Sequence, residues 1–375
     1  MRRSNCFWTW VLASGTLLAA VSVGVEADDP VSSSVRFNRE IIRILQRRCL
    51  PCHLPGTLAM PLATYRDVRE WSRAIREEVV EQRMPPSTAA PGYGRFENAL
   101  GLTSRETTTL LSWLDGGMPR GDERDLPASL DPGAGEAAND PAHARFDLPE
   151  QSIPAIEELV VRRVVVDPRL TADRLVSRVV VRPGSRAVLR GALVYAGPGE
   201  QSWVGGWLPW QHTFVAPANH AFVLAKGASL TIVLYYRGGD QPAVDRSSVE
   251  LHFAREPSRP LDSLRIETAA GQAGSLTSPA NGLGRLTLPA PTTIWALQPV
   301  IGATTQSLEL RAERPDGAID VLLWMPTVRP EWPNVLILQQ PAVLPAGTVL
   351  RLSTRRADAA SAPDRIILSA WREER

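Results

Sequence analysis

Hydrophobic residues follow two different periods along the chain, and the change between them divides it. Before residue 125, apolar residues recur at helical spacing, at 37–45 and behind the T-x-x-[DE] patterns at 64–67 and 103–106. Such patterns are typical of capping boxes at helix starts. We therefore expect residues 35–125 to form a small all-α domain.

Beyond residue 148 the pattern changes to short β-branched runs that are separated by turn residues. The runs expected to be strands are 159–167, 174–182, 187–195, 229–236, 249–254, 263–268, 284–289, 308–324, 348–356 and 365–371. RPDG at 314–317 predicts a hairpin turn, because proline fixes φ and glycine accepts a positive φ. Many short strands without helices between them predict an all-β antiparallel double sandwich, similar to a jelly roll.

Changes in composition mark further boundaries. Residues 126–147 are rich in Pro, Gly, Ala and Asp without a period, which predicts a linker. The turn PSRP at 257–260 lies near the middle of the β region, so we expect one sandwich at 148–260 and a second at 261–375. At 375 residues the chain is long enough for this multidomain fold, a small all-α domain followed by a double sandwich.

The N-terminus has the pattern of a secretory signal. Arg2 and Arg3 precede an uncharged apolar stretch at 7–25, and small residues surround Ala27. This predicts a signal peptide at 1–27 and a periplasmic or otherwise exported protein. If the signal is not cleaved, the apolar stretch is just long enough to anchor the chain in a membrane, and we expect membrane contact only in that case.

Charge and cysteine content limit the classes of function that the chain can have. With 41 basic and 40 acidic residues the formal charge is +1, which gives no reason to expect nucleic acid or an anionic membrane as a partner. Cys6 lies in the expected signal, so the exported chain would keep only Cys49 and Cys52. Two cysteines do not make a disulfide scaffold and need another explanation.

The segment CLPCH at 49–53 fits three chemistries. C-x-x-C-H supplies two thiols for covalent haem attachment, and His53 would be an axial ligand of the iron. A redox dithiol is also C-x-x-C, but it normally lies in a βαβ setting, and the flanking segments here are helical. A zinc site needs two further ligands, and the other histidines, at 143, 212, 220 and 252, are distant in the sequence. The spacing favours one haem c.

The sixth ligand of such a haem is expected to be Met84. It precedes two prolines, which would form a stiff loop able to hold a thioether over the ring. Met60 and Met118 are the alternatives. Met is the axial partner that suits electron transfer.

These segments together resemble the class I cytochrome c domains of exported bacterial proteins. The resemblance rests on CLPCHLPG at 49–56, MPP at 84–86 and LLSWLDGGMPRGD at 110–122. It implies that Cys49 and Cys52 are thioether sites, that His53 and Met84 are the axial pair, and that a redox protein is the partner.

The β region resembles the copper type II, ascorbate-dependent monooxygenases of the peptidylglycine-hydroxylating kind. The resemblance rests on VVVRPGSRAVLRGALVYA at 179–196, GGWLPW at 205–210, LAKGASLTIVLYYRG at 224–238 and LPAGTVLRL at 344–352. That family places copper on histidines, but this chain has Leu189-Arg190, Tyr235-Tyr236 and ALQPVI at 296–301 in those positions. Copper is therefore not expected, because these side chains do not replace imidazole.

The remaining histidines and tryptophans are expected to be structural. A metal pair at His212 and His220 is the alternative for two of them, and we expect His252 to be a strand residue whose ring packs against a neighbour. We expect Trp203, Trp207 and Trp210 to pack within and between the sandwiches, with an aromatic binding surface as the alternative. Trp71 and Trp113 are expected in the helical core.

The function that the sequence favours is an exported c-type cytochrome that transfers single electrons, joined to a copper-less module for docking or binding. Two alternatives remain open: an oxygenase in which the haem feeds a metal site in the β region, and a haem-based sensor with a binding module. Electron transfer is favoured over catalysis, because the helical segment shows no acid–base machinery.

Overall fold

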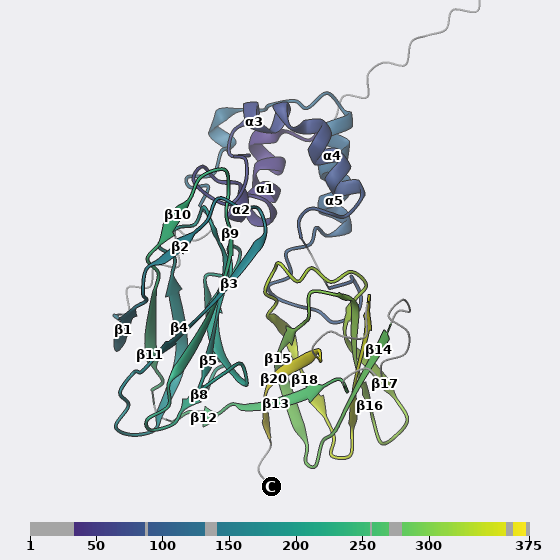
Figure 1. The fold of residues 1–375 in the computed structure, drawn as a ribbon. Coiled ribbons are helices and arrows are strands. Elements are labelled where there is room, and N and C mark those ends of the chain that lie inside the picture. Colours follow the sequence, from purple (N-terminus) through teal and green to yellow (C-terminus); the bar gives the residue numbers. More distant parts are fainter. Residues whose placement is uncertain are drawn as a thin grey trace, which may run out of the picture.

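The computed structural model describes residues 34–86, 89–131, 141–255, 257–269, 280–357 and 363–372. Strands make up 42% and helices 15% of the described residues. Helices lie at one end of the molecule, and two groups of strands lie beside one another below them (Figure 1). The helices are α1 (Ile42–Arg48), α2 (Leu50–His53), α3 (Tyr65–Glu70), α4 (Ser72–Val80) and α5 (Ser104–Asp115), with short turns of other helix types at Phe37–Ile41 and Glu123–Asp125.

The helices begin where the sequence predicts them to begin. Thr64 and Thr103 each form a complete capping box, in which the threonine side chain accepts a hydrogen bond from the backbone N–H of the third helical residue. Trp113 is fully buried between the helices, as expected. Trp71 is 41% exposed, so the expectation that it packs in the core is wrong.

The expected fold class is wrong, because the helices do not form a small all-α cytochrome domain. They are short, and the segment at 89–100 between α4 and α5 pairs with a strand instead of forming a helix. Phe96 forms a β-bridge with Leu338, and the Asn98 side chain donates to the Val335 carbonyl oxygen at 2.7 Å. The protein is therefore a mostly β structure in which the helical segment is tied to the sheet.

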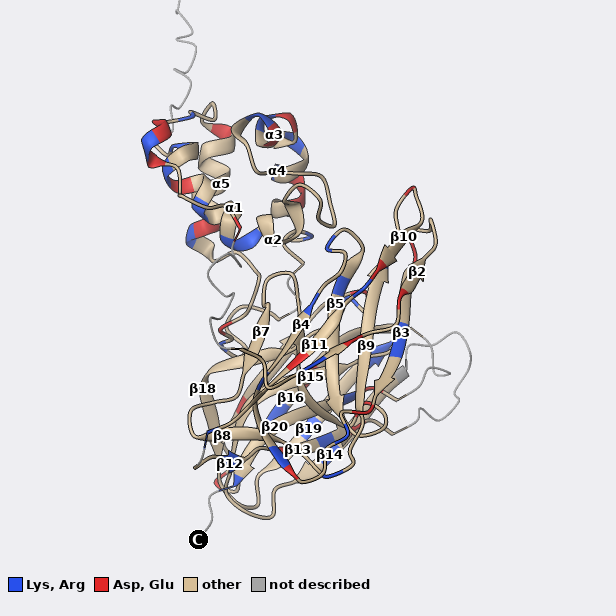
Figure 2. Ribbon diagram, turned by 90° about the vertical axis from the view of Figure 1, so that its left-hand side faces the viewer, with Lys and Arg blue, Asp and Glu red and all other residues tan. Residues whose placement is uncertain are grey.

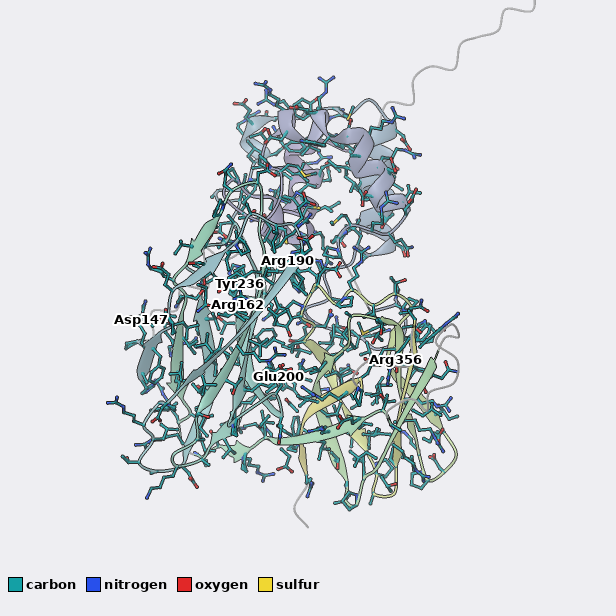
Figure 3. All side chains as sticks on the ribbon, in the orientation of Figure 1. Asp147, Arg162, Arg190, Glu200, Tyr236 and Arg356 are labelled. Atoms are coloured by element: carbon teal, nitrogen blue, oxygen red, sulfur yellow. The ribbon has the colours of Figure 1, made fainter. Side chains whose placement is uncertain are left out.

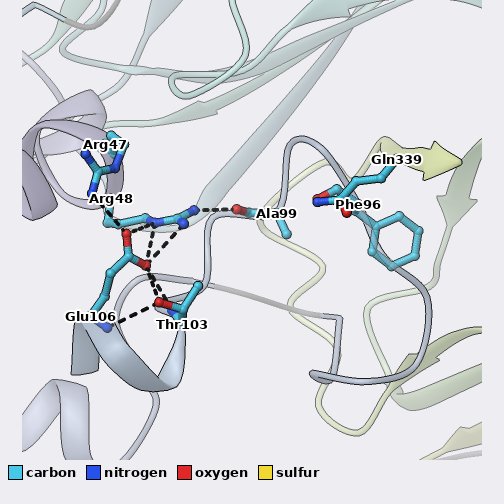
Figure 4. A network of polar contacts seen from close by, with 7 residues as sticks. All are labelled: Arg47, Arg48, Phe96, Ala99, Thr103, Glu106 and Gln339. Carbon is cyan, nitrogen blue, oxygen red and sulfur yellow. Dashed lines mark hydrogen bonds and ion pairs between the residues drawn. The ribbon is translucent and has the colours of Figure 1, made fainter. Parts of the chain in front are cut away.

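A network of charged side chains fixes the same segment to α1 and α5 (Figure 4). The Arg48 guanidinium donates to the Ala99 carbonyl oxygen at 2.8 Å and pairs with the Glu106 carboxylate at 3.1 Å. Partial burial raises the pKa of Glu106, but hydrogen bonds from Thr103 and Arg48 outweigh it, so the pKa lies below its ordinary value.

The first group of strands forms a ten-stranded sheet, called here the curled sheet, and a two-stranded sheet. The curled sheet has the order β1-β11-β4-β6-β5-β9-β3, with β7 and β8 also on β4 and β12 on β8; β2 pairs with β10. Pairing is antiparallel except for β4 with β6 and β8 with β12. The strands are β1 (Ala144–Asp147), β2 (Gln151–Ile153), β3 (Leu159–Val166), β4 (Arg174–Arg182), β5 (Leu189–Ala196), β6 (Ser202–Trp207), β7 (Thr213–Val215), β8 (His220–Leu224), β9 (Leu230–Arg237), β10 (Ala243–Asp245), β11 (Ser248–Phe253) and β12 (Arg259–Pro260).

The second group forms a sandwich of two four-stranded sheets, in the orders β13-β20-β15-β18 and β14-β19-β16-β17. Buried leucines from both sheets, such as Leu297 and Leu352, share one hydrophobic core. The strands are β13 (Asp262–Glu267), β14 (Ala280–Thr287), β15 (Thr292–Val300), β16 (Thr305–Glu313), β17 (Ile319–Met325), β18 (Leu336–Leu344), β19 (Val349–Arg356) and β20 (Arg365–Arg372).

The curled sheet and the sandwich contact one another through apolar and charged side chains. Trp203 of the curled sheet lies 6.2 Å from Trp295 of the sandwich between ring centroids. The carboxylate of Glu200, labelled in Figure 3, pairs with Arg163 at 2.8 Å and with Arg365 of the sandwich at 3.0 Å. Trp203 and Trp207 are buried, which confirms that they are packing residues.

Several boundaries expected from the sequence stay predictions. Pairing changes from the curled sheet to the sandwich between β12 and β13, and β1 begins at Ala144, within the segment expected to be a linker. The expected signal at 1–27 lies outside the described residues. Among the helices that the structure describes, none is long and apolar enough to cross a membrane.

Candidate functional site

The CLPCH segment forms a tight helical turn that points its cysteines inward. Cys49 ends α1, and its carbonyl oxygen accepts from the backbone N–H groups of Cys52 and His53, each at 3.1 Å. The Cys52 side chain is 8% exposed, and Cys49 is half-buried. His53 donates from Nδ1 to the Met60 carbonyl oxygen at 2.8 Å, which fixes its ring. Met84 belongs to the loop after α4 and is 39% exposed.

Burial raises the pKa of both thiols to about 12. Arg48 opposes this shift at Cys49, and Arg190 and Arg186 of the curled sheet oppose it at Cys52. Both thiols are therefore protonated at neutral pH, and since the thiolate is the nucleophile, the pair does not have the properties of a reactive dithiol.

We expect the two thiols to react slowly while the chain is folded. At pH 8 a thiol with a pKa of about 12 holds roughly 1000-fold less thiolate than one with the ordinary value of 9.0. The rate of iodoacetamide labelling, measured by mass spectrometry, should therefore be lower in the native protein than in urea by a factor of the same order. This prediction would be contradicted if the labelling rate of the native protein lay within tenfold of the rate of the unfolded protein. It would also be contradicted if both cysteines already carried an adduct.

The expectation of haem c is corrected by the structure. In the described part of the chain, no group of three or more histidine, cysteine, aspartate and glutamate side chains is placed to hold a metal ion. The Cys49 and Cys52 thiols are protonated at neutral pH, and Nδ1 of His53 donates to the Met60 carbonyl oxygen. The described residues therefore give no support to haem c.

The histidines of the β region do not form a metal site either. His212 bonds to the Pro209 carbonyl oxygen at 2.9 Å, and His220 bonds to the Ala218 carbonyl oxygen at the same distance. His252 is buried, with Nδ1 3.0 Å from an Arg178 nitrogen. The expectation that His252 is a strand residue with its ring against a neighbour is confirmed.

The structure places one buried arginine of the curled sheet close to the CLPCH segment. Arg190 lies on β5, where pairing with β9 shifts between Leu189 and Gly191, and such an irregularity redirects a side chain. Its guanidinium carbon lies 4.8 Å from the ring centroid of Trp332, which belongs to the sandwich. Figure 3 shows Arg190 at the end of the strands nearest the helices.

Arg190 is an unusual buried charge. It is 9% exposed, and its Nε atom has no hydrogen-bond partner among the described residues. Burial, followed by repulsion from Arg237, lowers the pKa of Arg190, while Glu331 and Cys52 oppose that shift. Burying a cation whose donors lack hydrogen-bond partners costs free energy. Such an arginine therefore marks a candidate binding site.

A second arginine of the curled sheet region also acts on Cys52. Arg186, in the turn before β5, pairs through Nη1 with Asp131 at 3.4 Å, while its buried Nη2 has no partner among the described residues. The positive charges of Arg190 and Arg186 both lower the pKa of Cys52, so both guanidinium groups interact electrostatically with that thiol. We call Cys52, Arg186, Arg190 and Trp332 the junction site, because it joins the helical segment, the curled sheet and the sandwich.

The wall of the junction site is aromatic and closely packed. Trp210 lies 5.6 Å from Trp332 between ring centroids, which confirms that Trp210 packs between the two groups of strands. A Cβ atom on Gly191 would lie 2.4 Å from Pro333 Cγ, so only glycine allows this approach of β5 to the sandwich. Trp210 also lines a small cavity of about 20 Å³, shared with Asn98 and Leu336, that has room for about one water molecule.

Sequence reasoning missed Arg186 and Arg190 as site residues. From the sequence, Arg190 stands out only as a residue in the place of a copper-binding histidine. The available signal was a single charge between apolar residues in AVLRGALVY at 187–195, which is uncommon in a buried strand.

Comparisons with known proteins place the chain in no family. No family model matches it, and no curated protein matches it. Among solved structures, the major capsid protein P2 of bacteriophage PM2 is similar over 60% of this chain and 97% of that one, with 11% identity and a TM-score of 0.23. The VP54 protein of PBCV-1 is similar over 62% and 94%, with 9% identity and a TM-score of 0.20. A putative secreted protein from Parabacteroides distasonis gives 62% and 89%, with 9% identity and a TM-score of 0.17.

These findings correct the resemblances drawn from the sequence. The structure is mostly β, and neither the family models nor the curated proteins give support to a class I cytochrome c or a copper type II monooxygenase. The similarity scores are too low to carry an argument about function.

Proposed function

We propose that this chain is an exported, non-catalytic binding protein that takes up the anionic group of a ligand at the junction site. The observation that carries this proposal is the buried Arg190, whose Nε lacks a partner among the described residues. An anion there would supply the missing acceptor and would neutralise a desolvated charge.

The surroundings of Arg190 support the same conclusion. Arg186, which also acts on Cys52, has a buried donor nitrogen without a described partner, and a guanidinium group suits a carboxylate or phosphate oxygen. Cys49 and Cys52 add no negative charge, because their thiols are protonated at neutral pH. Electron transfer is not part of this function, because it would require haem c.

The proposal predicts that binding of a small carboxylate depends on Arg190. We expect acetate to bind the wild-type protein and to raise its Tm, whereas acetamide, which has a similar shape without charge, does not. Arg190→Met keeps most of the side-chain volume but removes the donors, and should weaken acetate binding about 10- to 100-fold, as for loss of a charge-assisted hydrogen bond. Titration calorimetry at constant ionic strength measures it.

Arg259→Met is the matched control, because Arg259 is exposed on β12. Its acetate affinity should equal that of the wild type. The proposal fails if acetate and acetamide bind alike, if Arg190→Met binds acetate as tightly as the control does, or if neither acetate nor phosphate binds at tens of millimolar.

A further inference from the structure

Three arginines lie side by side on one sheet of the sandwich. In the strand register, Arg351 on β19 lies directly opposite Arg285 on β14 and directly opposite Arg311 on β16. Neighbouring strands lie about 4.8 Å apart, so the three residues form a row across the sheet with one cation on each strand. We call Arg285, Arg311 and Arg351 the arginine ladder.

The arginine ladder is on the solvent side of this sheet, called here the outer face. Leu350 and Leu352 are buried on either side of Arg351, and successive residues of a strand point to opposite faces. Trp295 and Ile367 of the other sheet pack in the core of the curled sheet, so the sheet β14-β19-β16-β17 is the one turned away from it. The described helices lie at the other end of the molecule in both views, and blue segments of Lys and Arg are visible near the labels of β16 and β19 (Figures 1 and 2).

The arginine ladder is only partly neutralised within the protein. Like charges directly opposite one another on neighbouring strands are destabilising. Glu313 of β16 pairs with Arg351 at 2.6 Å and with Arg311 at 3.4 Å. The hydrogen bond from Arg351 and the positive charges of the ladder hold the pKa of Glu313 below its ordinary value, so its carboxylate is ionised at neutral pH. Arg285 forms no hydrogen bond or ion pair among the described residues, so positive charge is left over.

The charge of the outer face is positive when every charged residue on it is included. The face carries four arginines and two glutamates, a net charge of +2: Arg285, Arg311, Arg351, Arg355, Glu309 and Glu313. In the hairpin at its end, Arg314 pairs with Asp320 at 2.6 Å, and Asp316 adds one negative charge in the turn. Arg356 is buried on the other side of the sheet, where it pairs with Asp364.

A second row of side chains runs beside the arginine ladder, two residues along the same strands. Leu283, Ser353, Glu309 and Trp324 lie opposite one another in the register of β14, β19, β16 and β17. Glu309 has neither an ion pair nor a hydrogen bond with any residue that the structure describes. Its carboxylate can accept from hydroxyl donors, and the half-buried indole of Trp324 offers a flat apolar surface for the C–H groups of a sugar ring.

We propose that the outer face binds an acidic polysaccharide, with sugar carboxylates on the arginine ladder and sugar hydroxyls on the second row. Guanidinium groups bind carboxylates through paired hydrogen bonds. A polysaccharide with one acid on each sugar brings the anions that the ladder lacks and also the hydroxyl donors that Glu309 lacks. This proposal is independent of ligand binding at the junction site.

The spacing favours a polysaccharide over an acidic peptide. Side chains on one face of an extended peptide recur about every 6.8 Å, twice the rise per residue, whereas the ladder arginines are about 4.8 Å apart. The carboxylates of such a peptide also bring no donor to Glu309.

The test is binding of polygalacturonate to the purified full chain, measured by titration calorimetry at low ionic strength. We expect polygalacturonate to bind, whereas its methyl ester, which has the same backbone without the charge, does not. Arg285→Gln removes a ladder charge that has no partner in the described protein, and should weaken binding about fivefold. Changing all three ladder arginines to glutamine should weaken it about 100-fold, at roughly fivefold for each.

The control triple variant changes Arg66, Arg73 and Arg105 to glutamine. These residues are exposed on the helices, and their loss removes the same net charge. The control should bind polygalacturonate as the wild type does, and circular dichroism should show that both triple variants fold; Arg285→Gln alone decides the result if the ladder variant does not. Equal losses in the two triple variants, equal binding of the methyl ester, or no binding by the wild type would overturn the proposal. Tighter binding of poly-glutamate than of polygalacturonate would also overturn it and would assign the face to an acidic protein.

Discussion

Replacing Asp364 by alanine is expected to lower the free energy of unfolding by about 3–5 kcal/mol, because it leaves a buried charge without its partner. Asp364 pairs with Arg356 at 2.9 Å, and their side chains are 0% and 1% exposed. Its other carboxylate oxygen accepts from the Thr305 hydroxyl at 2.6 Å and from the Gly302 N–H at 3.0 Å. Urea denaturation followed by circular dichroism measures the change.

Asp115→Ala provides the control for this prediction. Asp115 forms an ion pair with Arg76, but both side chains are half or more exposed, at 55% and 50%. Exposed pairs contribute about 0–1 kcal/mol, so this variant should unfold almost as the wild type does. If Asp364→Ala costs no more than Asp115→Ala, the buried network does not stabilise the sandwich.

The second large effect is expected at Trp113, which is fully buried in the helical core. Its indole N–H donates to the Pro119 carbonyl oxygen at 3.0 Å, and its ring lies 5.8 Å from that of Phe37. Trp113→Ala should therefore cost about 3–5 kcal/mol in the stability of the helical segment. Hydrogen exchange of α5 measures it locally.

Trp71→Ala is the matched control, because the same residue type is 41% exposed there. Surface changes of this kind usually fall within about 0.5 kcal/mol. The protection of α5 amides from hydrogen exchange should fall in Trp113→Ala and should stay unchanged in Trp71→Ala. Equal effects of the two variants would mean that burial of Trp113 does not determine the stability of this segment.

Sequence patterns predicted the strands best where β-branched residues dominate. The run at 174–182 coincides with β4, and the run at 159–167 ends one residue beyond β3. The hairpin turn at 314–317 is also confirmed, since Arg314 donates to the Ala318 carbonyl oxygen and Gly317 has a φ of 87°. Local propensity and turn chemistry agree in these segments.

Three of the strands that were not expected carry residues that disfavour strands. β6 contains Gly205 and Gly206, β15 contains Pro299, and β18 contains Pro341. Such residues weaken a strand locally, so only tertiary pairing could reveal these elements. Pairing between distant segments has no local signature.

The fold class was mispredicted for a related reason. Helical periodicity finds helices, but it does not say whether they pack alone or against a sheet. The segment at 89–100 has no periodicity, and its partners on β18 lie more than 200 residues later in the chain. The junction site was missed likewise, because Arg190 and Trp332 are brought together only by the packing of the curled sheet against the sandwich.

The pairing of residues 89–100 with β18 also bears on solubility. β18 is the last strand of its sheet, and an open strand edge is a template for pairing with other chains. Glu97 donates its backbone N–H to the Ile337 carbonyl oxygen, and Gln339 donates to that of Arg95, so backbone groups along this edge are already occupied. The helical segment thus shields the sandwich from edge-to-edge aggregation, a protection that a chain without residues 89–100 would lose.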